Sequence, residues 1–271
     1  MNDRLARFQQ HTRANRHALG WFSVVAAAAA LAALSISCAA HAGEPVPAEG
    51  LMLRPGNWAQ DAGGYVLPAA LTSSPDRWPT SGWVRVTHKA TALQVQAVAA
   101  PARGLPPFLH DIAVQVADPD APATTRGEAE AEAVDTRYLR IPGARIAEGR
   151  LPVVVFPRGT LTPRVDHPYQ LVLGDTPFTL TVQNGLRNKA GVAYGQGAVY
   201  TVQMGEHTMR WHLDNGSGWD TRVLAAADLD SDGKPDFIVQ SGDQEMLLLS
   251  SRAQPGRNAP AAVLVVQSHG C

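Results

Sequence analysis

The stretch AAADLDSDGKPDFIV, residues 225–239, places four aspartates and a glycine between two apolar runs. The aspartates stand at positions 1, 3, 5 and 9 of a loop whose sixth residue is Gly233. Alternate carboxylates around a tight glycine turn can converge on one calcium ion, and the carbonyl at position 7 adds another oxygen. Without a cation these negative charges would repel one another. The sequence therefore predicts a calcium site, and the alternative is an acidic turn without an ion. The predicted ligands are Asp228, Asp230, Asp232, Lys234 and Asp236.

The residues on either side of this loop distinguish it from helical calcium motifs. An EF-hand needs a bidentate Glu at position 12, where this chain has Val239. Pro235 and the β-branched residues that follow it oppose the start of a helix. A dockerin would carry a second copy of the loop, and the chain has no second copy. We therefore expect strands on both sides, RVLAAA (222–227) before the loop and DFIVQSG (236–242) after it.

With an apolar strand, D-x-D-x-D-G-x-x-D and a second apolar strand, residues 222–242 resemble the FG-GAP or VCBS repeat. The resemblance implies a strand-loop-strand unit that holds calcium. The tail from Met246, with its LSS segment and terminal Gly-Cys, also resembles bacterial secreted proteins of uncharacterised role. FG-GAP modules usually form propeller blades in several copies. A single copy does not predict a propeller ring.

Elsewhere the apolar residues alternate with polar ones, which is typical of half-buried antiparallel strands. A continuous apolar run at 151–159, flanked by prolines, predicts a core strand between two turns. With 24 glycines and 20 prolines as breaks, and no helical period visible after residue 42, we expect an all-β fold: an antiparallel β-sandwich or barrel with a C-terminal strand-loop-strand calcium unit. The alternating segments are 83–88, 92–99, 112–118, 169–174, 178–185 and 198–205.

The first 42 residues are typical of a signal peptide. Four arginines precede an alanine-rich apolar run, and Ala40-His41-Ala42 matches the small-x-small pattern of a cleavage site. We expect the mature chain to begin at Gly43, to be secreted or periplasmic, and to have no membrane span. Two alternatives stay open, a retained membrane anchor and a lipid on Cys38.

Charge and cysteine content limit the partners of the mature chain. Removing four arginines and one aspartate from 23 basic and 24 acidic residues leaves 19 and 23, a formal charge of −4. This charge gives no nucleic-acid footprint, which would need clustered Lys and Arg. Cys271 is then the single cysteine, so it could join two chains by a disulfide but cannot form one within the chain.

The composition along the chain indicates four parts. They are a signal peptide (1–42), a linker (43–50), a β-rich domain (51–210) and a calcium-binding region similar to FG-GAP or VCBS (211–271). A long acidic loop is expected at 117–133. Its Asp118 and Asp120 are interrupted by prolines, and no glycine follows, which favours a solvated loop over a second metal site.

No catalytic motif stands out. His207 and His212 are five residues apart on a predicted strand, whereas zincin chemistry needs two histidines four apart on a helix. Trp211 and Trp219 flank a loop, where packing against a strand is favoured over a sugar platform. We expect an exported calcium-binding β protein, a non-enzymatic binding or structural module with an unknown protein or cell-surface partner. The alternative is a secreted hydrolase with structural calcium.

Overall fold

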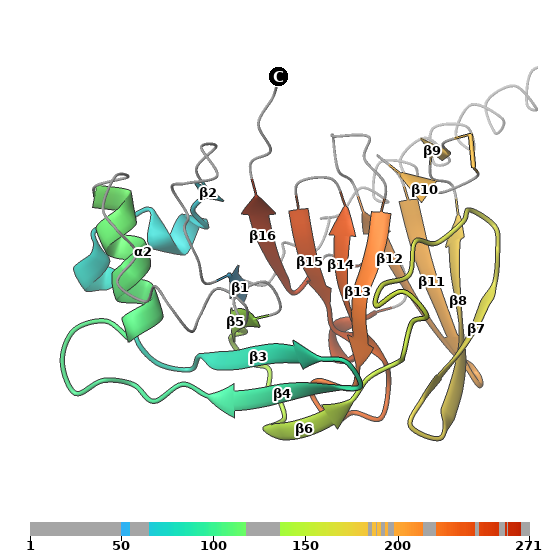
Figure 1. The fold of residues 1–271 in the computed structure, drawn as a ribbon, viewed down its shortest axis with the longest axis horizontal. Helices are drawn as coiled ribbons and strands as arrows, with labels where there is room; N and C mark the ends of the chain where they lie inside the picture. The colour runs from blue at the N-terminus through green and yellow to red at the C-terminus, as the bar shows by residue number, and fades with distance from the viewer. Residues whose placement is uncertain are drawn as a thin grey trace, which may run out of the picture. The chain divides into compact units, whose positions relative to one another are not determined.

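The computed structural model describes residues 50–54, 65–117, 136–183, 186–187, 189–190, 193–194, 198–213, 221–241, 244–254, 258 and 260–266, all within the unit Pro45–Cys271 (Figure 1). About half of them lie in strands. The strands are β1 (Gly50–Leu53), β2 (Tyr65–Val66), β3 (Val84–Lys89), β4 (Ala92–Ala97), β5 (Thr136–Arg140), β6 (Gly149–Pro152), β7 (Tyr169–Leu173), β8 (Thr176–Gln183), β9 (Leu186–Arg187), β10 (Ala193–Tyr194), β11 (Ala198–Met204), β12 (His207–Leu213), β13 (Thr221–Ala227), β14 (Asp236–Ser241), β15 (Gln244–Leu248) and β16 (Ala262–Val266). The helices are η2 (Ala69–Leu71), η3 (Pro75–Arg77), α2 (Pro107–Ala117) and η4 (Ser250–Arg252).

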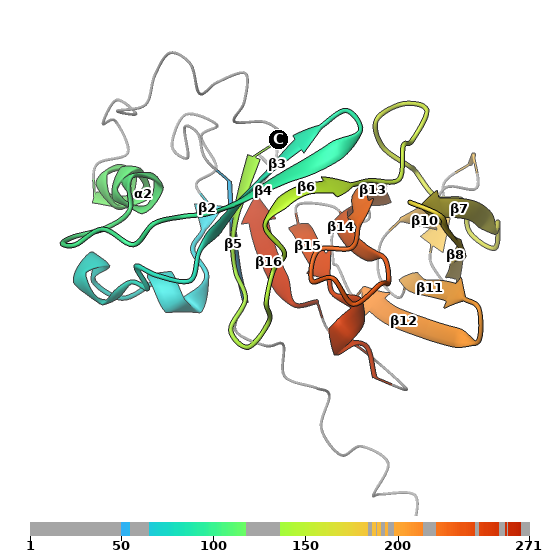
Figure 2. The same cartoon turned by 90° about the horizontal axis from the view of Figure 1, so that it is seen from below.

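The larger sheet is nearly closed on itself. Its strand order is β13-β14-β15-β16-β1-β5-β3-β4-β6, with β2 paired to β16. Neighbours along this order are antiparallel except β1 and β16, which are parallel. Just after β6, Val153 bridges to Ala227 and the N–H of Val154 donates to the carbonyl of Ala226 at 2.9 Å. The last strand therefore returns to the first, and Figure 2 shows β6 beside β13.

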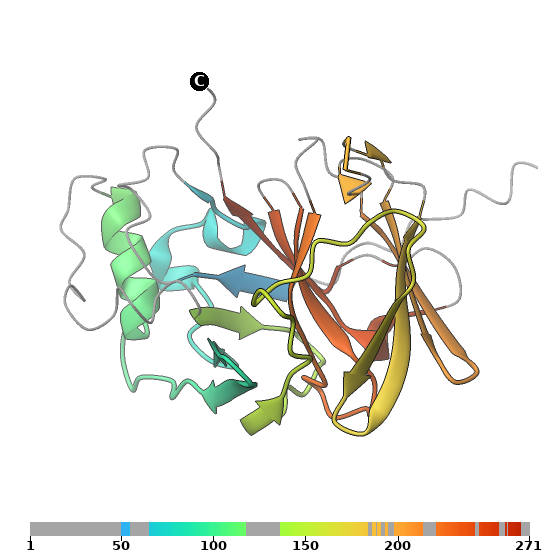
Figure 3. The same ribbon diagram turned by 45° about the vertical axis from the view of Figure 1, so that its right-hand side comes forward.

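A second sheet packs on one face of the first. Its order is β12-β11-β8-β7, all antiparallel, and β9 pairs with β10 in a separate two-stranded sheet. Figure 3 shows the four-stranded sheet beside β13, β14 and β15. In β8 the buried residues Phe178, Leu180 and Val182 alternate with more exposed ones, so one face of this sheet is apolar. That face encloses a second hydrophobic core against the larger sheet.

Strands β13, β14 and β15 belong to both cores. Phe237 and Val239 of β14 lie in the core between the two sheets, whereas Ile238 lies in the core inside the larger sheet. A β-bulge in β13 interrupts the pairing between Val223 and Ala225, so these two residues serve different cores although they are two apart. Burial on both faces explains why these strands read as continuous apolar runs.

The all-β expectation is confirmed. The predicted segments 83–88, 92–99, 169–174, 178–185 and 198–205 correspond to β3, β4, β7, β8 and β11, and the strands expected around the aspartate loop are β13 and β14. The predicted boundary between residues 210 and 211 lies within β12, and β16 on its far side pairs with β1. No helix in the described part of the chain is long and apolar enough to cross a membrane.

The strand predicted at 112–118 is wrong, because residues 107–117 form α2. Pro107 at the start of the helix needs no hydrogen-bond acceptor, and the N–H groups of Leu109 and His110 donate to the carbonyl of Pro106. Phe108, Leu109 and Ile112 are buried on one side of the helix. The alternating segment begins at residue 112 and so leaves out the first turn of the helix, where Phe108 and Leu109 make the helical period visible. The expectation of no helical period after residue 42 fails with it.

The core strand predicted at 151–159 is also wrong in extent. Strand β6 ends at Pro152, and the chain continues through a single bridge at Val153. Val153, Val154 and Phe156 are buried, but Val155 is 64% exposed. Proline has no N–H to continue a sheet ladder, so the apolar run crosses from one core to the other as an irregular segment.

Several predictions concern residues outside the described ones. These are the signal peptide at 1–42 with Cys38, the acidic loop with Asp118 and Asp120, Trp219, and Cys271.

Candidate metal centre

The aspartate loop connects β13 to β14, as the sequence predicts. It begins after Ala227 and ends where Asp236 starts β14. Both oxygens of Asp228 accept backbone N–H groups from within the loop, from Asp232 at 3.0 Å and from Gly233 at 3.0 Å. Gly233 has a φ of 79°, in the left-handed region that glycine adopts without steric cost. The side chain of the first aspartate therefore folds the loop back on itself.

Three of the four aspartates converge. Asp228, Asp230 and Asp236 each present one carboxylate oxygen, and these oxygens lie within 4.8 Å of one another. Two oxygens that bind the same calcium ion at about 2.3–2.6 Å can be no more than about 5.2 Å apart. The spacing is thus compatible with a shared calcium ion before any rearrangement of the loop.

Asp236 is the buried anchor of the group, with only 1% of its surface exposed. One oxygen accepts the N–H of Leu229 at 2.7 Å. The other accepts the N–H of Ser250 at 2.7 Å and the Ser250 hydroxyl at 2.8 Å. These bonds fix the start of β14 against both the loop and η4, so the position of this carboxylate is set by the fold.

Asp230 carries an oxygen that the protein leaves unsatisfied. Its Oδ2 accepts a hydrogen bond from the Ser251 hydroxyl. Its Oδ1 is buried and has no hydrogen-bond partner among the described residues. A buried carboxylate oxygen without a donor costs free energy unless something else binds it. A cation among the three aspartates would fill that role.

Burial and mutual repulsion raise the pKa values of two aspartates in the group. Burial, and then the charge of Asp230, raise the pKa of Asp236 to about 8, even though Ser250 and Leu229 donate hydrogen bonds to it. Burial also raises the pKa of Asp230; the Ser251 hydrogen bond opposes this shift, and the charge of Asp232 adds to it. A buried carboxyl group with a pKa raised as far as that of Asp236 is typical of sites where a cation can take the place of the proton.

The remaining predicted ligands, Asp232 and Lys234, interact with each other. Oδ1 of Asp232 accepts the N–H of Lys234 at 2.9 Å and the hydroxyl of Ser250 at 3.0 Å. Its Oδ2 lies 3.3 Å from the Lys234 ammonium group. Asp232 is therefore outside the convergent group in this structure, while the carbonyl of Lys234 stays a predicted ligand.

Sequence reasoning missed Ser250 and Ser251 as part of the site. Their hydroxyls reach Asp232, Asp236 and Asp230 from η4, which follows β15. The LSS segment was visible in the sequence, but nothing in its spacing linked it to a loop about 20 residues earlier. The link comes from the antiparallel pairing of β14 with β15, which places Phe237 opposite Leu248.

Two histidines and a tryptophan that the sequence singled out lie on β12. His207 and His212 lie on β12, a strand and not a helix, so they do not form the zincin arrangement. Trp211 of the same strand is buried, with its ring 6.2 Å from that of Phe237. This residue packs in the core, as the sequence favoured.

Comparison of the chain with protein-family models, curated proteins and solved structures finds no match. The similarity to FG-GAP or VCBS repeats therefore stays a resemblance carried by residues 222–242.

Proposed function

We propose that the protein is an exported calcium-binding β module and that the ion binds between β13 and β14. The observation that carries the proposal is the convergence of Asp228, Asp230 and Asp236, together with a buried oxygen of Asp230 that has no hydrogen-bond partner among the described residues. Bound calcium would satisfy that oxygen and remove the repulsion among the three carboxylates. Export is the part of the proposal that rests on the signal-peptide pattern of residues 1–42.

The donor set favours calcium over softer metals. All the available ligand atoms are carboxylate oxygens, hydroxyls and backbone carbonyls, and no histidine or cysteine belongs to the described cluster. Hard oxygen ligands suit calcium, whereas zinc and copper prefer nitrogen and sulfur. Magnesium needs near-ideal octahedral geometry, which three aspartates fixed to different parts of the fold do not readily supply.

A binding or structural role fits the site better than a hydrolytic one. The carboxylates of Asp228 and Asp236 accept hydrogen bonds from backbone N–H groups and so position the loop. The unpartnered oxygen belongs to Asp230, and no histidine or cysteine joins that residue in the described cluster to form an acid–base pair or a nucleophile. We propose that the ion holds the loop rigid at the end of β13 and β14, where a protein or cell-surface partner can contact it.

The test is isothermal titration calorimetry of calcium chloride into metal-free protein. We expect one ion per chain, with binding lost or weakened at least about tenfold in Asp230→Asn, which keeps the shape of the side chain and removes its charge. The matched control is Asp175→Asn, an exposed aspartate in the β7–β8 turn, which should bind calcium like the wild type. Absence of calcium binding by the wild type, or equal binding by Asp230→Asn, would refute the proposal.

A further inference from the structure

A cavity of about 480 Å³ opens within the nearly closed sheet. Strands from distant parts of the strand order line it, including β3, β4, β5, β13, β14 and β15. Its apolar surface comes from core residues such as Val86, Leu93 and Ile238, and from Leu224, the residue displaced by the β-bulge in β13. The volume is within the range of about 300–1,000 Å³ usual for small-molecule sites.

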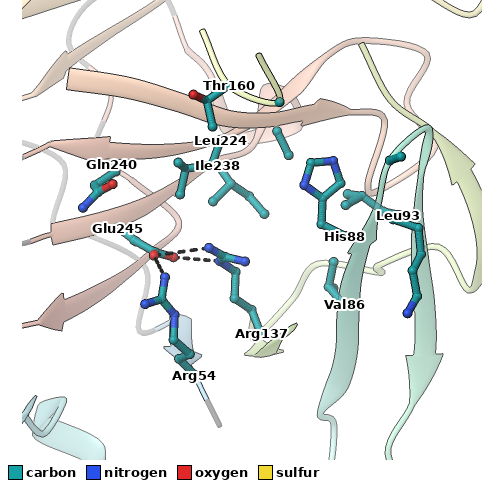
Figure 4. A pocket seen from close by; sticks show the side chains of 14 residues that line it. Arg54, Val86, His88, Leu93, Arg137, Thr160, Leu224, Ile238, Gln240 and Glu245 are labelled. Carbon is teal, nitrogen blue, oxygen red and sulfur yellow. Dashed lines mark hydrogen bonds and ion pairs between the residues drawn. The ribbon is translucent and has the colours of Figure 1, made fainter. Parts of the chain in front are cut away.

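The polar part of the cavity is a carboxylate held between two guanidinium groups (Figure 4). Arg137 donates from Nε to one oxygen of Glu245 at 2.7 Å and from Nη2 to the other at 3.2 Å. Arg54 donates to Glu245 as well, from the end of β1. Glu245 is 2% exposed and Arg137 is 7% exposed, so this pair is buried in the wall of the cavity, whereas the side chain of Arg54 is 27% exposed.

Positive charge exceeds negative charge here. In the wall of the cavity, the guanidinium groups of Arg54 and Arg137 contact a single carboxylate, Glu245, which gives this cluster a formal charge of +1. One carboxylate balances one guanidinium, so the second is in excess. An excess charge close to the protein interior is costly unless a counter-ion reaches it.

Arg54 also has a free donor. Its Nε is buried and has no hydrogen-bond partner among the described residues. Buried N–H groups are nearly always paired, because an unpaired one loses its hydration without replacement. Figure 4 shows the guanidinium group of Arg54 below Glu245 and that of Arg137 to the right of it, with the apolar residues Leu224 and Ile238 above them. An anionic group next to Arg54 would thus have both a charge partner and a donor.

We propose that this cavity binds a small organic carboxylate with an aliphatic body. The carboxylate pairs with the guanidinium group of Arg54, and the hydrocarbon part lies against Val86, Leu93 and Ile238. The site is separate from the aspartate loop, so the proposal does not depend on bound calcium. The aspartate motif gives no role to the charged cavity, and a bound carboxylate would give it one.

The first test uses three probes on the wild-type protein in calcium-saturated buffer. Octanoate has both the charge and the hydrocarbon chain, acetate has the charge alone, and 1-octanol has the chain alone. Calorimetry should show octanoate binding at least about tenfold more tightly than either of the others, because one charge-assisted hydrogen bond accounts for roughly that factor. Equal affinity for octanoate and acetate, or for octanoate and 1-octanol, would contradict the proposal without any variant.

Variants then locate the site. Arg54→Gln should weaken octanoate binding at least about tenfold, whereas Arg85→Gln should leave it unchanged. Arg85 is the matched control because it lies on β3 but is exposed, with its side chain bonded to Gln96. Glu245→Gln should strengthen octanoate binding, since it removes the carboxylate that competes for Arg54. Unchanged affinity in Arg54→Gln, at an unchanged melting midpoint, would overturn the assignment.

Discussion

Two alanine substitutions in the aspartate loop should separate its structural role from its ion-binding role. Asp236→Ala removes the acceptor of three hydrogen bonds, two of them from the backbone N–H groups of Leu229 and Ser250. Asp230→Ala removes one hydrogen bond from the exposed Ser251 and also the buried oxygen that has no partner. The two aspartates are equal in a calcium motif but not in this fold.

The sizes follow from those contacts. Each buried N–H group left without an acceptor costs about 1–3 kcal/mol, so Asp236→Ala should lower the free energy of unfolding by about 2–6 kcal/mol even in chelator. Asp230→Ala should change the free energy of unfolding in chelator by less than about 1 kcal/mol, because the lost surface hydrogen bond is offset by relief of repulsion. It should nevertheless remove the gain from calcium, which is about 2.7 kcal/mol at a hundredfold excess over the dissociation constant.

The assay is urea denaturation of the wild type and both variants at neutral pH, in millimolar calcium and in chelator. The wild type should be more stable in calcium, and Asp230→Ala should show the same midpoint in both buffers. A calcium-dependent increase that persists in Asp230→Ala would contradict the site. A larger loss in chelator for Asp230→Ala than for Asp236→Ala would contradict the assignment of Asp236 as the structural anchor.

Three further predictions follow from the structure and the sequence. Burial raises the pKa of Asp236 from 3.8 to about 8 in the metal-free fold, so the folded chain retains a proton that the unfolded chain releases. The contribution of this group to stability should therefore be complete below pH 3.8 and be lost as the pH rises to about 8. Melting midpoints in chelator measure this loss, and Asp236→Asn is the comparison that should not show it. Gly50→Ala should destabilise the protein by about 1–3 kcal/mol or more, because a Cβ there would lie 1.9 Å from the carbonyl oxygen of Ala261; an unchanged melting midpoint would mean that β1 and β16 do not pair so closely. Intact mass of the exported protein should place its first residue at Gly43 with no lipid, and a lipidated Cys38 as first residue would contradict the cleavage site.

The local parts of the fold were predictable because they depend on neighbours in sequence. Alternation at 178–185 predicted a strand where β8 lies, and the aspartate spacing together with Pro235 predicted a loop between strands. The helix α2 was missed because alternation in IAVQVAD matches a strand, whereas its helical face depends on Phe108 and Leu109 just before it. A short apolar segment fits either period, and packing decides between them.

The long-range parts could not be read from one sequence. Arg137 and Glu245 are 108 residues apart, and Arg54 and Glu245 are 191 residues apart. Nothing in the pattern around either arginine indicates that it will face that carboxylate. The contacts exist because β5 pairs with β1, β1 pairs with β16 in parallel, and β16 pairs with β15, which brings distant parts of the sequence into one sheet.

The two-faced burial of β13, β14 and β15 has a consequence for how the protein loses its structure. These strands form a common wall, with one core on each side. If either core opened alone, the wall would expose an apolar face to water, so the two halves should melt in a single cooperative transition. The aspartate loop joins two strands of that wall. An ion bound there would raise the resistance of the entire wall to unfolding, including the side that holds the cavity.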